Sequence, residues 1–295
     1  MVSGSFLSGL GLPASAVAGL PGGAAYALMG VGLVLLYQMG GVLSLCQSAI
    51  GVFGAVLFQG WYDSGRSMWL ALPAGLLLSA ALAAAVGWLM TRWFADKSLL
   101  IRSAVTIACA VSFSALALRL YGTDSLVFPF LLPAARFEVA SVIVSANTVL
   151  ALALAAVTGA GMWALLRFSR LGVWLKAMAE RAPAAELLGA PVRILNVGLW
   201  AFSGALAALA LIVIAPTQQS DVSSLGTVAL PALAAALIGG FRSFGVTIAV
   251  GIAIGVLESV IMASSLAAYN SLVSVALVLG VLLWSRRGDV WNEAR

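Results

Sequence analysis

The hydrophobic pattern of this chain consists of long apolar stretches separated by short breaks that carry Gly, Pro or charged residues. The stretches cover residues 24–37, 42–60, 68–90, 98–118, 139–166, 194–216, 226–239, 243–264 and 266–284. A helix needs about 20 apolar residues to cross a hydrocarbon core of about 30 Å, and most of these stretches approach that length. Backbone groups in lipid must satisfy one another, so we expect helices and not the short alternating strands of a membrane barrel.

The composition supports a membrane protein. The chain is 63% hydrophobic and 8% charged, with a mean hydropathy of +1.11, whereas a soluble domain carries roughly 25% charged residues. We predict an all-α, polytopic transmembrane helix bundle with roughly eight or nine spans, some broken or short. Residues 1–295 form one transmembrane domain in this interpretation, because the spans leave little chain for soluble domains. Residues 1–23 are weakly apolar, and whether they form a span decides the side on which Met1 lies.

The charged residues predict the orientation of the bundle. The net charge of +5 is compatible with nucleic acid, but the cations lie at the ends of apolar stretches, where they mark cytoplasmic loops. These basic segments are residues 92–97, residues 167–193, the turn at Arg242, and the C-terminus with Arg286, Arg287 and Arg295. The segments around Asp63, at 119–138 and at 217–225 are neutral or acidic and are expected outside. The C-terminus should therefore be cytoplasmic.

Two apolar segments, 30–59 and 228–259, are interrupted in the same way. Gly40-Gly41 breaks the first and Gly239-Gly240 breaks the second, each followed by polar residues. Paired interrupted segments in a transporter indicate two related halves and a central site. Two ordinary tight turns explain the same pattern, because Gly-Gly is also a turn signal.

One acidic residue, Glu258, lies inside an apolar stretch. A helix that begins at Arg242 places it about 24 Å along the axis, toward the outer end. An acid at such a position lines a pathway, pairs with a neighbouring residue or lies at the membrane interface. Gly251 and Gly255 in the same stretch have the spacing that allows close approach of two helices, within the chain or between copies.

Segment 167–193 is a charged, amphipathic interruption of an otherwise apolar chain. Its cations outnumber its acids: they are Arg167, Arg170, Lys176, Arg181 and Arg193, against Glu180 and Glu186. The sequence from Ala184 to Gly189 is typical of a helix, a turn and a second helix. Such an element can dock onto a soluble partner, and a solvated loop face is the simpler interpretation.

The sequence contains little catalytic chemistry. It has no histidine, no P-loop and no Gly-x-Ser-x-Gly motif, and Cys46 and Cys109 lack metal-ligand spacing. We therefore expect no catalytic residues, no metal site and no ATP site of its own in this chain. A transporter built on it that uses ATP needs a separate ATPase polypeptide.

Three blocks of the chain, in order, resemble the permease subunits of branched-chain amino-acid ABC importers of the LivH and LivM type. They are residues 43–55, which lead from small polar residues into a Gly-Ala helix, residues 180–210, and residues 235–259. The likeness covers roughly residues 24–285. The chain departs from the family pattern at Cys46 and Arg242, where glycine is expected, and at Gln47, where some members have histidine. These departures concern the solute class more than the fold.

The resemblance implies a transport mechanism in a prokaryotic inner membrane. Two permease chains, the same or sisters, form the pathway, cytoplasmic ATPases bind the ATP, and an extracytoplasmic binding protein delivers the solute. A branched-chain amino acid or a similar small polar solute would move inward. The resemblance assigns ATPase coupling to Glu180, Arg181, Ala184, Ala185, Glu186 and Gly189. The candidates for pathway lining are Ser44, Gln47, Ser48, Gly239, Gly240, Ser243 and Glu258.

Two other functions stay open on the sequence. A stand-alone, ion-coupled carrier or channel is the main alternative, with Glu258 as its one candidate ion-coupling residue. Such a carrier does not need segment 167–193 as a docking element. A membrane assembly factor without transport activity is the third. The sequence does not specify the solute or whether the permease pairs with itself.

Overall fold

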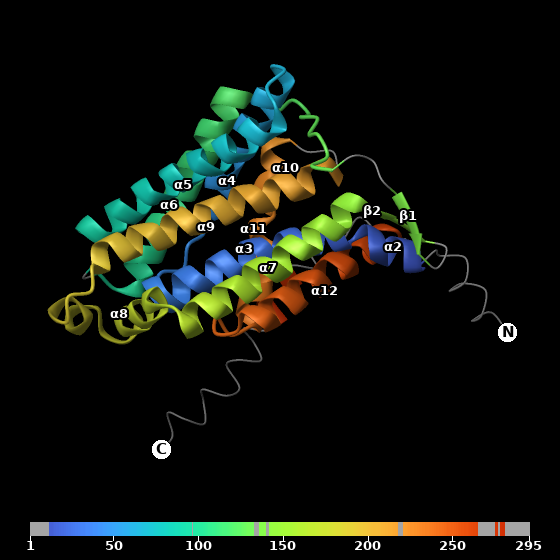
Figure 1. Ribbon diagram of the computed structural model, residues 1–295. Coiled ribbons are helices and arrows are strands. Elements are labelled where there is room, and N and C mark those ends of the chain that lie inside the picture. Colours follow the sequence, from blue (N-terminus) through green and yellow to red (C-terminus); the bar gives the residue numbers. More distant parts are fainter. Residues whose placement is uncertain are drawn as a thin grey trace.

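The fold is a bundle of membrane-spanning helices (Figure 1). The computed structural model describes residues 12–95, 97–132, 136–139, 142–217, 221–264, 275–276 and 278–280. Six helical segments in this part are long and apolar enough to cross a membrane: Ser15–Gly40, Met68–Trp93, Leu99–Tyr121, Ala146–Phe168, Val192–Thr217 and Phe244–Met262. The prediction of a polytopic helix bundle is confirmed.

Most of the long helices overlap the predicted apolar stretches. They are α2 (Leu12–Ala18), α3 (Leu20–Gly40), α4 (Gln47–Asp63), α5 (Met68–Trp93), α6 (Leu99–Tyr121), α7 (Ala146–Phe168), α8 (Arg170–Leu187), α9 (Val192–Ile214), α10 (Val222–Thr227), α11 (Ala229–Ile238) and α12 (Phe244–Met262), with a 3-10 turn at Ala215–Thr217. The stretches at 42–60 and 226–239 appear as shorter apolar helices. The stretch at 266–284 and the C-terminus lie almost entirely outside the described residues.

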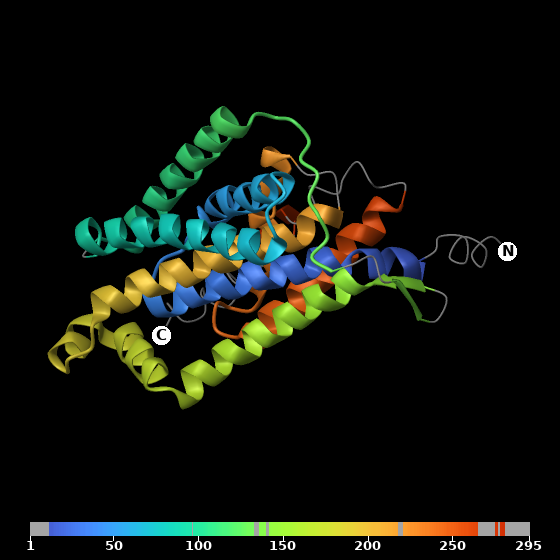
Figure 2. The same ribbon diagram turned by 45° about the horizontal axis from the view of Figure 1, so that its top comes forward.

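Helix α3 is the centre of the bundle. It packs against α7, α9, α11 and α12 (Figure 1). In the span Ser15–Gly40, which contains α3, 83% of the residues in the most apolar part are buried. In α6, which lies on the rim of the bundle (Figure 2), that share is 6%. A helix that is apolar on every side is suited to both places, because its neighbours are protein in one case and lipid in the other.

Helices α3 and α12 approach each other along a seam of small residues. A Cβ atom added to Gly251 would lie 2.8 Å from the backbone nitrogen of Ala27, and one added to Gly255 would collide with the backbone of Gly23. Only glycine allows this separation. The predicted close packing at Gly251 and Gly255 is therefore found inside the subunit.

A short β-hairpin corrects one expected helix boundary. Strand β1 (Arg136–Val139) pairs antiparallel with β2 (Val142–Ser145), with Val139 opposite Val142. We expected the apolar stretch from residue 139 to be helical, but α7 begins only at Ala146. The run of Val142, Ile143 and Val144 favours a strand because its residues are β-branched. Ser145 then starts the helix, since its Oγ accepts a hydrogen bond from the backbone N–H of Thr148.

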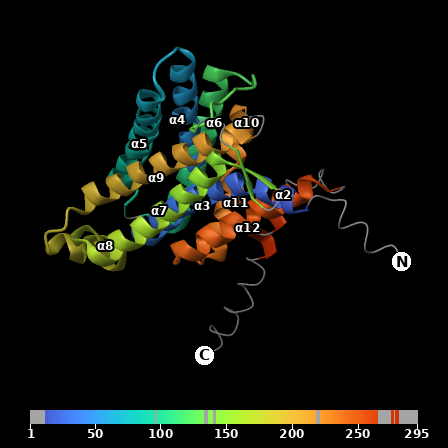
Figure 3. The ribbon, with the colours of Figure 1, turned by 45° about the vertical axis from the view of Figure 1, so that its right-hand side comes forward.

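Three of the four segments predicted to be cytoplasmic, namely residues 92–97, residues 167–193 and the turn at Arg242, lie at one end of the bundle in their described residues, and the C-terminus lies outside the described residues. Asn196, near the start of α9, donates a hydrogen bond to Thr91 at the end of α5 (3.0 Å). Arg102, near the start of α6, donates to the carbonyl of Gly40 at the end of α3 (3.4 Å). Helix α8 lies where α7 ends and α9 begins (Figure 3). We call this the basic end of the molecule.

Candidate functional site

The first interruption, residues 41–46, separates α3 from α4 by a non-helical segment that is exposed at Gly41 and buried at Val42, Ser44 and Cys46. Gly41 adopts a left-handed conformation with φ of 60° and its N–H bonds to the carbonyl of Tyr37 (3.1 Å), which ends α3. The predicted break at Gly40-Gly41 is therefore present. After this break, α4 begins at Gln47, whose side chain is buried in the bundle.

The polar residues of this interruption are buried. Ser44, Gln47 and Ser48 have exposed fractions of 5% or less. Gln47 Nε2 donates a hydrogen bond to Ser203 Oγ of α9, and Gln47 Oε1 has no hydrogen-bond partner among the described residues. Gly32 of α3 leaves room for this pair, since a Cβ added there would lie 2.8 Å from Ser203 Oγ. These three pathway candidates therefore lie together in packed protein.

Helix α6 holds the first interruption in place through two residues that the sequence reasoning missed. Arg102 donates to the Gly40 carbonyl. Thr106 Oγ1 accepts from the Leu45 N–H (3.4 Å) and shares its one proton between the carbonyls of Leu43 (3.0 Å) and Ser103 (2.8 Å). The positive Arg102 side chain also lies at the negative end of the α3 dipole. A sequence signal existed: Arg102 and Thr106 are four residues apart, hence on one helix face, inside an otherwise apolar stretch.

The second interruption, residues 239–243, is a tight turn between α11 and α12 at the basic end. Gly240 and Phe241 both have positive φ, 61° and 51°, and the latter value is uncommon for a residue with a side chain. The Phe241 ring packs on Tyr37 of α3 with centroids 4.4 Å apart. Ser243 Oγ accepts a hydrogen bond from the Val246 N–H (3.3 Å) and so caps α12. Gly240 and Arg242 are exposed.

A groove of about 920 Å³ opens beside this turn. Its walls come from the end of α3, from α7, from α8 and from the start of α12. The lining residues are Gln38, Met39, Ala156, Gly159, Ala160, Trp163, Leu166, Arg167, Lys176, Arg242, Ser243, Phe244, Gly245 and Ile248. Ser243 is the one pathway candidate in this lining.

Glu258 lies far along α12 from the turn, at the other end of the seam with α3. Its Oε2 accepts a hydrogen bond from the Tyr26 hydroxyl (2.6 Å), and next to it Ser259 Oγ donates to the Ser15 carbonyl (2.7 Å). Of the expected alternatives for Glu258, the structure shows pairing with a neighbour. The pathway candidates thus fall into three places: the buried first interruption, the turn at 239–243, and the α3–α12 seam.

The predicted coupling segment contains a kinked helix. Arg181 has non-helical backbone angles (φ −153°, ψ 97°), which divides α8 into two parts, and Pro183 lies in the first turn of the second part. Gly189 (φ 86°) ends the segment with an N–H bond to the Glu186 carbonyl (2.9 Å). The helix, turn and helix predicted around Ala184 and Gly189 are present.

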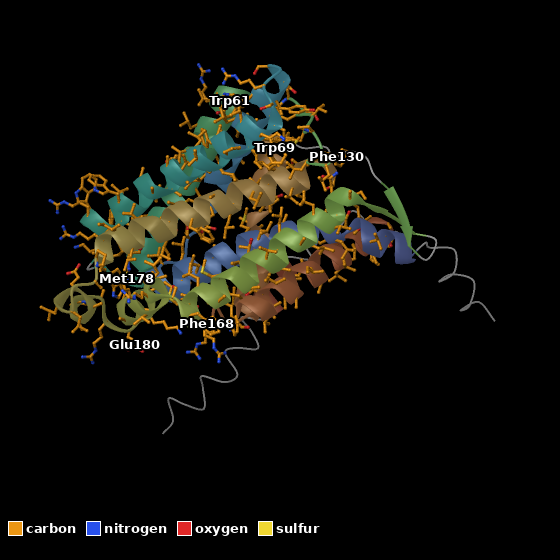
Figure 4. The ribbon with its side chains drawn as sticks, viewed as in Figure 1. Trp61, Trp69, Phe130, Phe168, Met178 and Glu180 are labelled. Atoms are coloured by element: carbon orange, nitrogen blue, oxygen red, sulfur yellow. The ribbon has the colours of Figure 1, made fainter. Side chains whose placement is uncertain are left out.

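Most of the expected coupling residues face outward. Glu180, Arg181, Ala184, Glu186 and Gly189 are exposed, whereas Ala185 is buried and anchors the segment. The sequence reasoning did not single out Leu187 and Leu188, which are 90% and 85% exposed at the tip. Figure 4 shows Glu180 at this end of the molecule, opposite Trp61 and Trp69. These two adjacent leucines give the tip a small exposed apolar surface.

Comparison with known proteins gives a consistent match over most of the chain. The profile of the family described as "Branched-chain amino acid transport system / permease component" matches residues 15–282. The chain is 26% identical over 279 residues to the high-affinity branched-chain amino acid transport system permease protein LivH of Escherichia coli K12, which covers 88% of this chain and 89% of that protein. LivH of E. coli O157:H7 matches to the same extent.

A solved structure, PsaBC from Streptococcus pneumoniae in complex with Fab, covers 95% of both chains at 16% identity. Its TM-score of 0.49 is too low to support a functional argument. The family match over residues 15–282 does not depend on this likeness. The chain belongs to the family of branched-chain amino acid transport system permease components.

Proposed function

We propose that this permease is the membrane subunit of an ABC importer. It moves a small polar solute, a branched-chain amino acid or a similar molecule, into the cell, and separate ATPase subunits that dock on residues 167–193 power the transport. The observation that carries the proposal is the tip of α8, where Leu187 and Leu188 are 90% and 85% exposed. A stand-alone carrier has no need to place two leucines there.

The geometry of α8 suits transmission of force from a soluble partner. The helix connects the ends of α7 and α9 with short links, so a displacement of α8 acts on two membrane-spanning helices. Ala185 is buried beneath the exposed tip. Glu180, Arg181 and Glu186 precede the leucines in sequence and are exposed, so that charges of both signs would give a partner specificity and orientation.

The solute pathway is part of the same proposal. Ser243, Gly239 and Gly240 would lie at its inner mouth, and Ser44, Gln47 and Ser48 would supply hydrogen-bonding groups deeper in the membrane. Because the first interruption is packed within the subunit, these groups would meet the solute only when α3 and α4 separate from α9. Glu258, which accepts a hydrogen bond from Tyr26, would hold α3 and α12 together at the outer end of their seam and would not contact the solute.

The partners are proposed on the same basis as the function. A second permease chain, the same or a sister, would complete the pathway. An extracytoplasmic binding protein would deliver the solute and determine selectivity. ATP would be bound by the ATPase subunits.

The test is a purification of the tagged chain in mild detergent from its native membrane, with co-purifying proteins identified by mass spectrometry. We expect a P-loop ATPase to accompany the wild-type chain and to be lost from the double variant Leu187→Asp, Leu188→Asp. Val127→Asp is the matched control, since Val127 is also an exposed apolar residue (80%) but belongs to the segment after α6.

Two results would contradict the proposal. If the double variant retains the ATPase, the docking surface lies elsewhere. If the wild-type chain yields a clean oligomer without ATPase, in membranes where the partner genes are expressed, a stand-alone carrier becomes the better explanation.

A further inference from the structure

The groove at the basic end has two chemically different parts. Its mouth carries three cations from three separate segments: Arg167 at the end of α7, Lys176 in α8 and Arg242 in the α11–α12 turn. Much of the remaining lining is apolar, and α7 meets α12 there, since a Cβ added to Gly159 would collide with Ile248; we call this part the floor. The floor residues are Ala156, Gly159, Ala160, Phe244, Gly245 and Ile248.

The cations at the mouth are not neutralised by the protein. No carboxylate lines the groove, and none of the three cations shares a hydrogen bond or ion pair with another side chain that the structure describes. Arg167 instead lies over the rings of Trp163 (5.2 Å) and Phe168 (5.7 Å). Three like charges around one opening repel one another, so an anion between them would relieve an unfavourable arrangement.

We expect the groove to lie at the boundary between lipid and water. Trp163 is 51% exposed near the end of the α7 span, as expected for an aromatic residue at the headgroup level. Phe168 is 74% exposed at the junction of α7 with α8 (Figure 4). The cationic mouth is therefore on the polar side of this boundary and the floor, between α7 and α12, is on the apolar side.

We infer that the groove binds an anionic phospholipid of the inner leaflet, with its phosphate between Arg167, Lys176 and Arg242 and one acyl chain on the floor. Each basic residue near an anionic surface strengthens binding about fivefold. Basic pockets between transmembrane helices on this side are suited to lipid headgroups. A free phosphate would use the mouth only and would leave the apolar floor in water. The inference does not depend on the proposed ATPase docking, but it competes with the pathway role proposed for Ser243, which lines the same groove.

The experiment measures lipid retained by the purified chain. The protein in neutral detergent is titrated with phosphatidylglycerol or with phosphatidylcholine of the same acyl chains, and bound lipid is counted by native mass spectrometry. We expect tighter retention of phosphatidylglycerol by the wild type. The double variant Arg167→Gln, Arg242→Gln should weaken that retention at least tenfold. The control Arg92→Gln, Lys97→Gln removes two exposed cations outside the groove lining. It should change the retention of phosphatidylglycerol less than twofold.

A second variant separates a lipid from a soluble anion. Ala160 is exposed on the groove floor, so Ala160→Leu fills the floor without removing a charge and without a clash inside the bundle. We expect Ala160→Leu to weaken phosphatidylglycerol retention several-fold. If the arginine variant does not fold, Ala160→Leu still tests the inference.

Three outcomes would overturn the inference. Equal retention of the two lipids by the wild type would remove the role of the phosphate charge. Unchanged retention in Ala160→Leu, together with displacement of the lipid by inorganic phosphate, would indicate a soluble-anion site. Loss of a co-purifying ATPase from the arginine variant with unchanged lipid retention would make the groove a protein docking surface.

Discussion

The two interrupted segments have similar sequences and different surroundings. Each consists of an apolar helix, a Gly-Gly pair, polar residues and a second apolar helix. In the first, Gly41 is exposed but the polar residues Ser44, Gln47 and Ser48 are buried. In the second, Gly240 and Arg242 are exposed, and the turn borders an open groove. The local pattern therefore sets where the helix stops, and the neighbouring helices decide whether the polar residues meet protein or solvent.

The neighbours explain the difference in physical terms. The first interruption is covered by α6, through Arg102 and Thr106, and by α9, through Ser203. Each of these contacts satisfies a polar group that would otherwise be unpaired in a membrane interior. The second interruption contacts α3 through the stacking of Phe241 on Tyr37 and satisfies its own backbone by the Ser243 cap. A turn whose polar groups are hydrogen-bonded within the turn itself can remain at the surface.

The largest predicted effect comes from overpacking the first interruption. Gly32→Val would push a side chain against Ser203 Oγ and Gln47 Oε1, at 2.8 and 3.3 Å from the added Cβ. We expect it to lower stability by about 3 kcal/mol, seen as a lower midpoint of thermal unfolding in detergent. Gly161→Val is the control, because nothing lies within 4 Å of a Cβ at this position. Equal losses would mean that the effect is only one of helix propensity.

Removing the contact from α6 should open the first interruption. Thr106→Val leaves the Leu43 carbonyl and the Leu45 N–H without this partner, at a cost of about 2 kcal/mol. Cys46 is a native reporter, since it is fully buried in this segment. In a Cys109→Ser background, Cys46 should react slowly with a maleimide in the parent and faster in Thr106→Val. A Cys46 that labels rapidly in both would show that the interruption is already open.

The second interruption should respond more weakly. Ser243→Ala removes the cap of α12, worth about 1 kcal/mol, while the conservative change Ser243→Asp keeps an acceptor there. The thermal midpoint should fall in the first variant and stay near the parent value in the second. A loss as large as that in Thr106→Val would show that the turn depends on the bundle as much as the first interruption does.

The smallest effect concerns the far end of α12. Tyr26→Phe removes the hydrogen bond to Glu258 but keeps the ring between α3 and α12. Hydrogen bonds between transmembrane helices contribute about 0.6 kcal/mol on average, so the thermal midpoint should change little. Transport by the assembled importer should also be nearly unchanged. A severe loss of transport in a stably folded variant would indicate that Glu258 lines the solute pathway.

Much of the fold followed from local chemistry. The apolar stretches predicted the helices, and the Gly-Gly pairs predicted both interruptions. Gly251 and Gly255 predicted a close helix contact, and residues 184–189 predicted the helix and turn of the charged segment. The hairpin at 136–145 was missed because its apolar residues were merged with the helix that follows. Arg102 was missed because its partner, the Gly40 carbonyl, is 62 positions away in sequence.

The sequence by itself determined the class, the helices, the interruptions and the gathering of positive charge at one end, because length, hydropathy and glycine act locally along a chain in lipid. Only the tertiary structure decided which helix is central, that Gln47 pairs with Ser203, that Glu258 pairs with Tyr26, and that Arg167, Lys176 and Arg242 surround one groove. In lipid, an apolar helix is compatible with the centre or the rim of a bundle, so composition does not assign its neighbours. These follow from the fit of small residues and the pairing of the few polar groups, which join positions far apart in sequence.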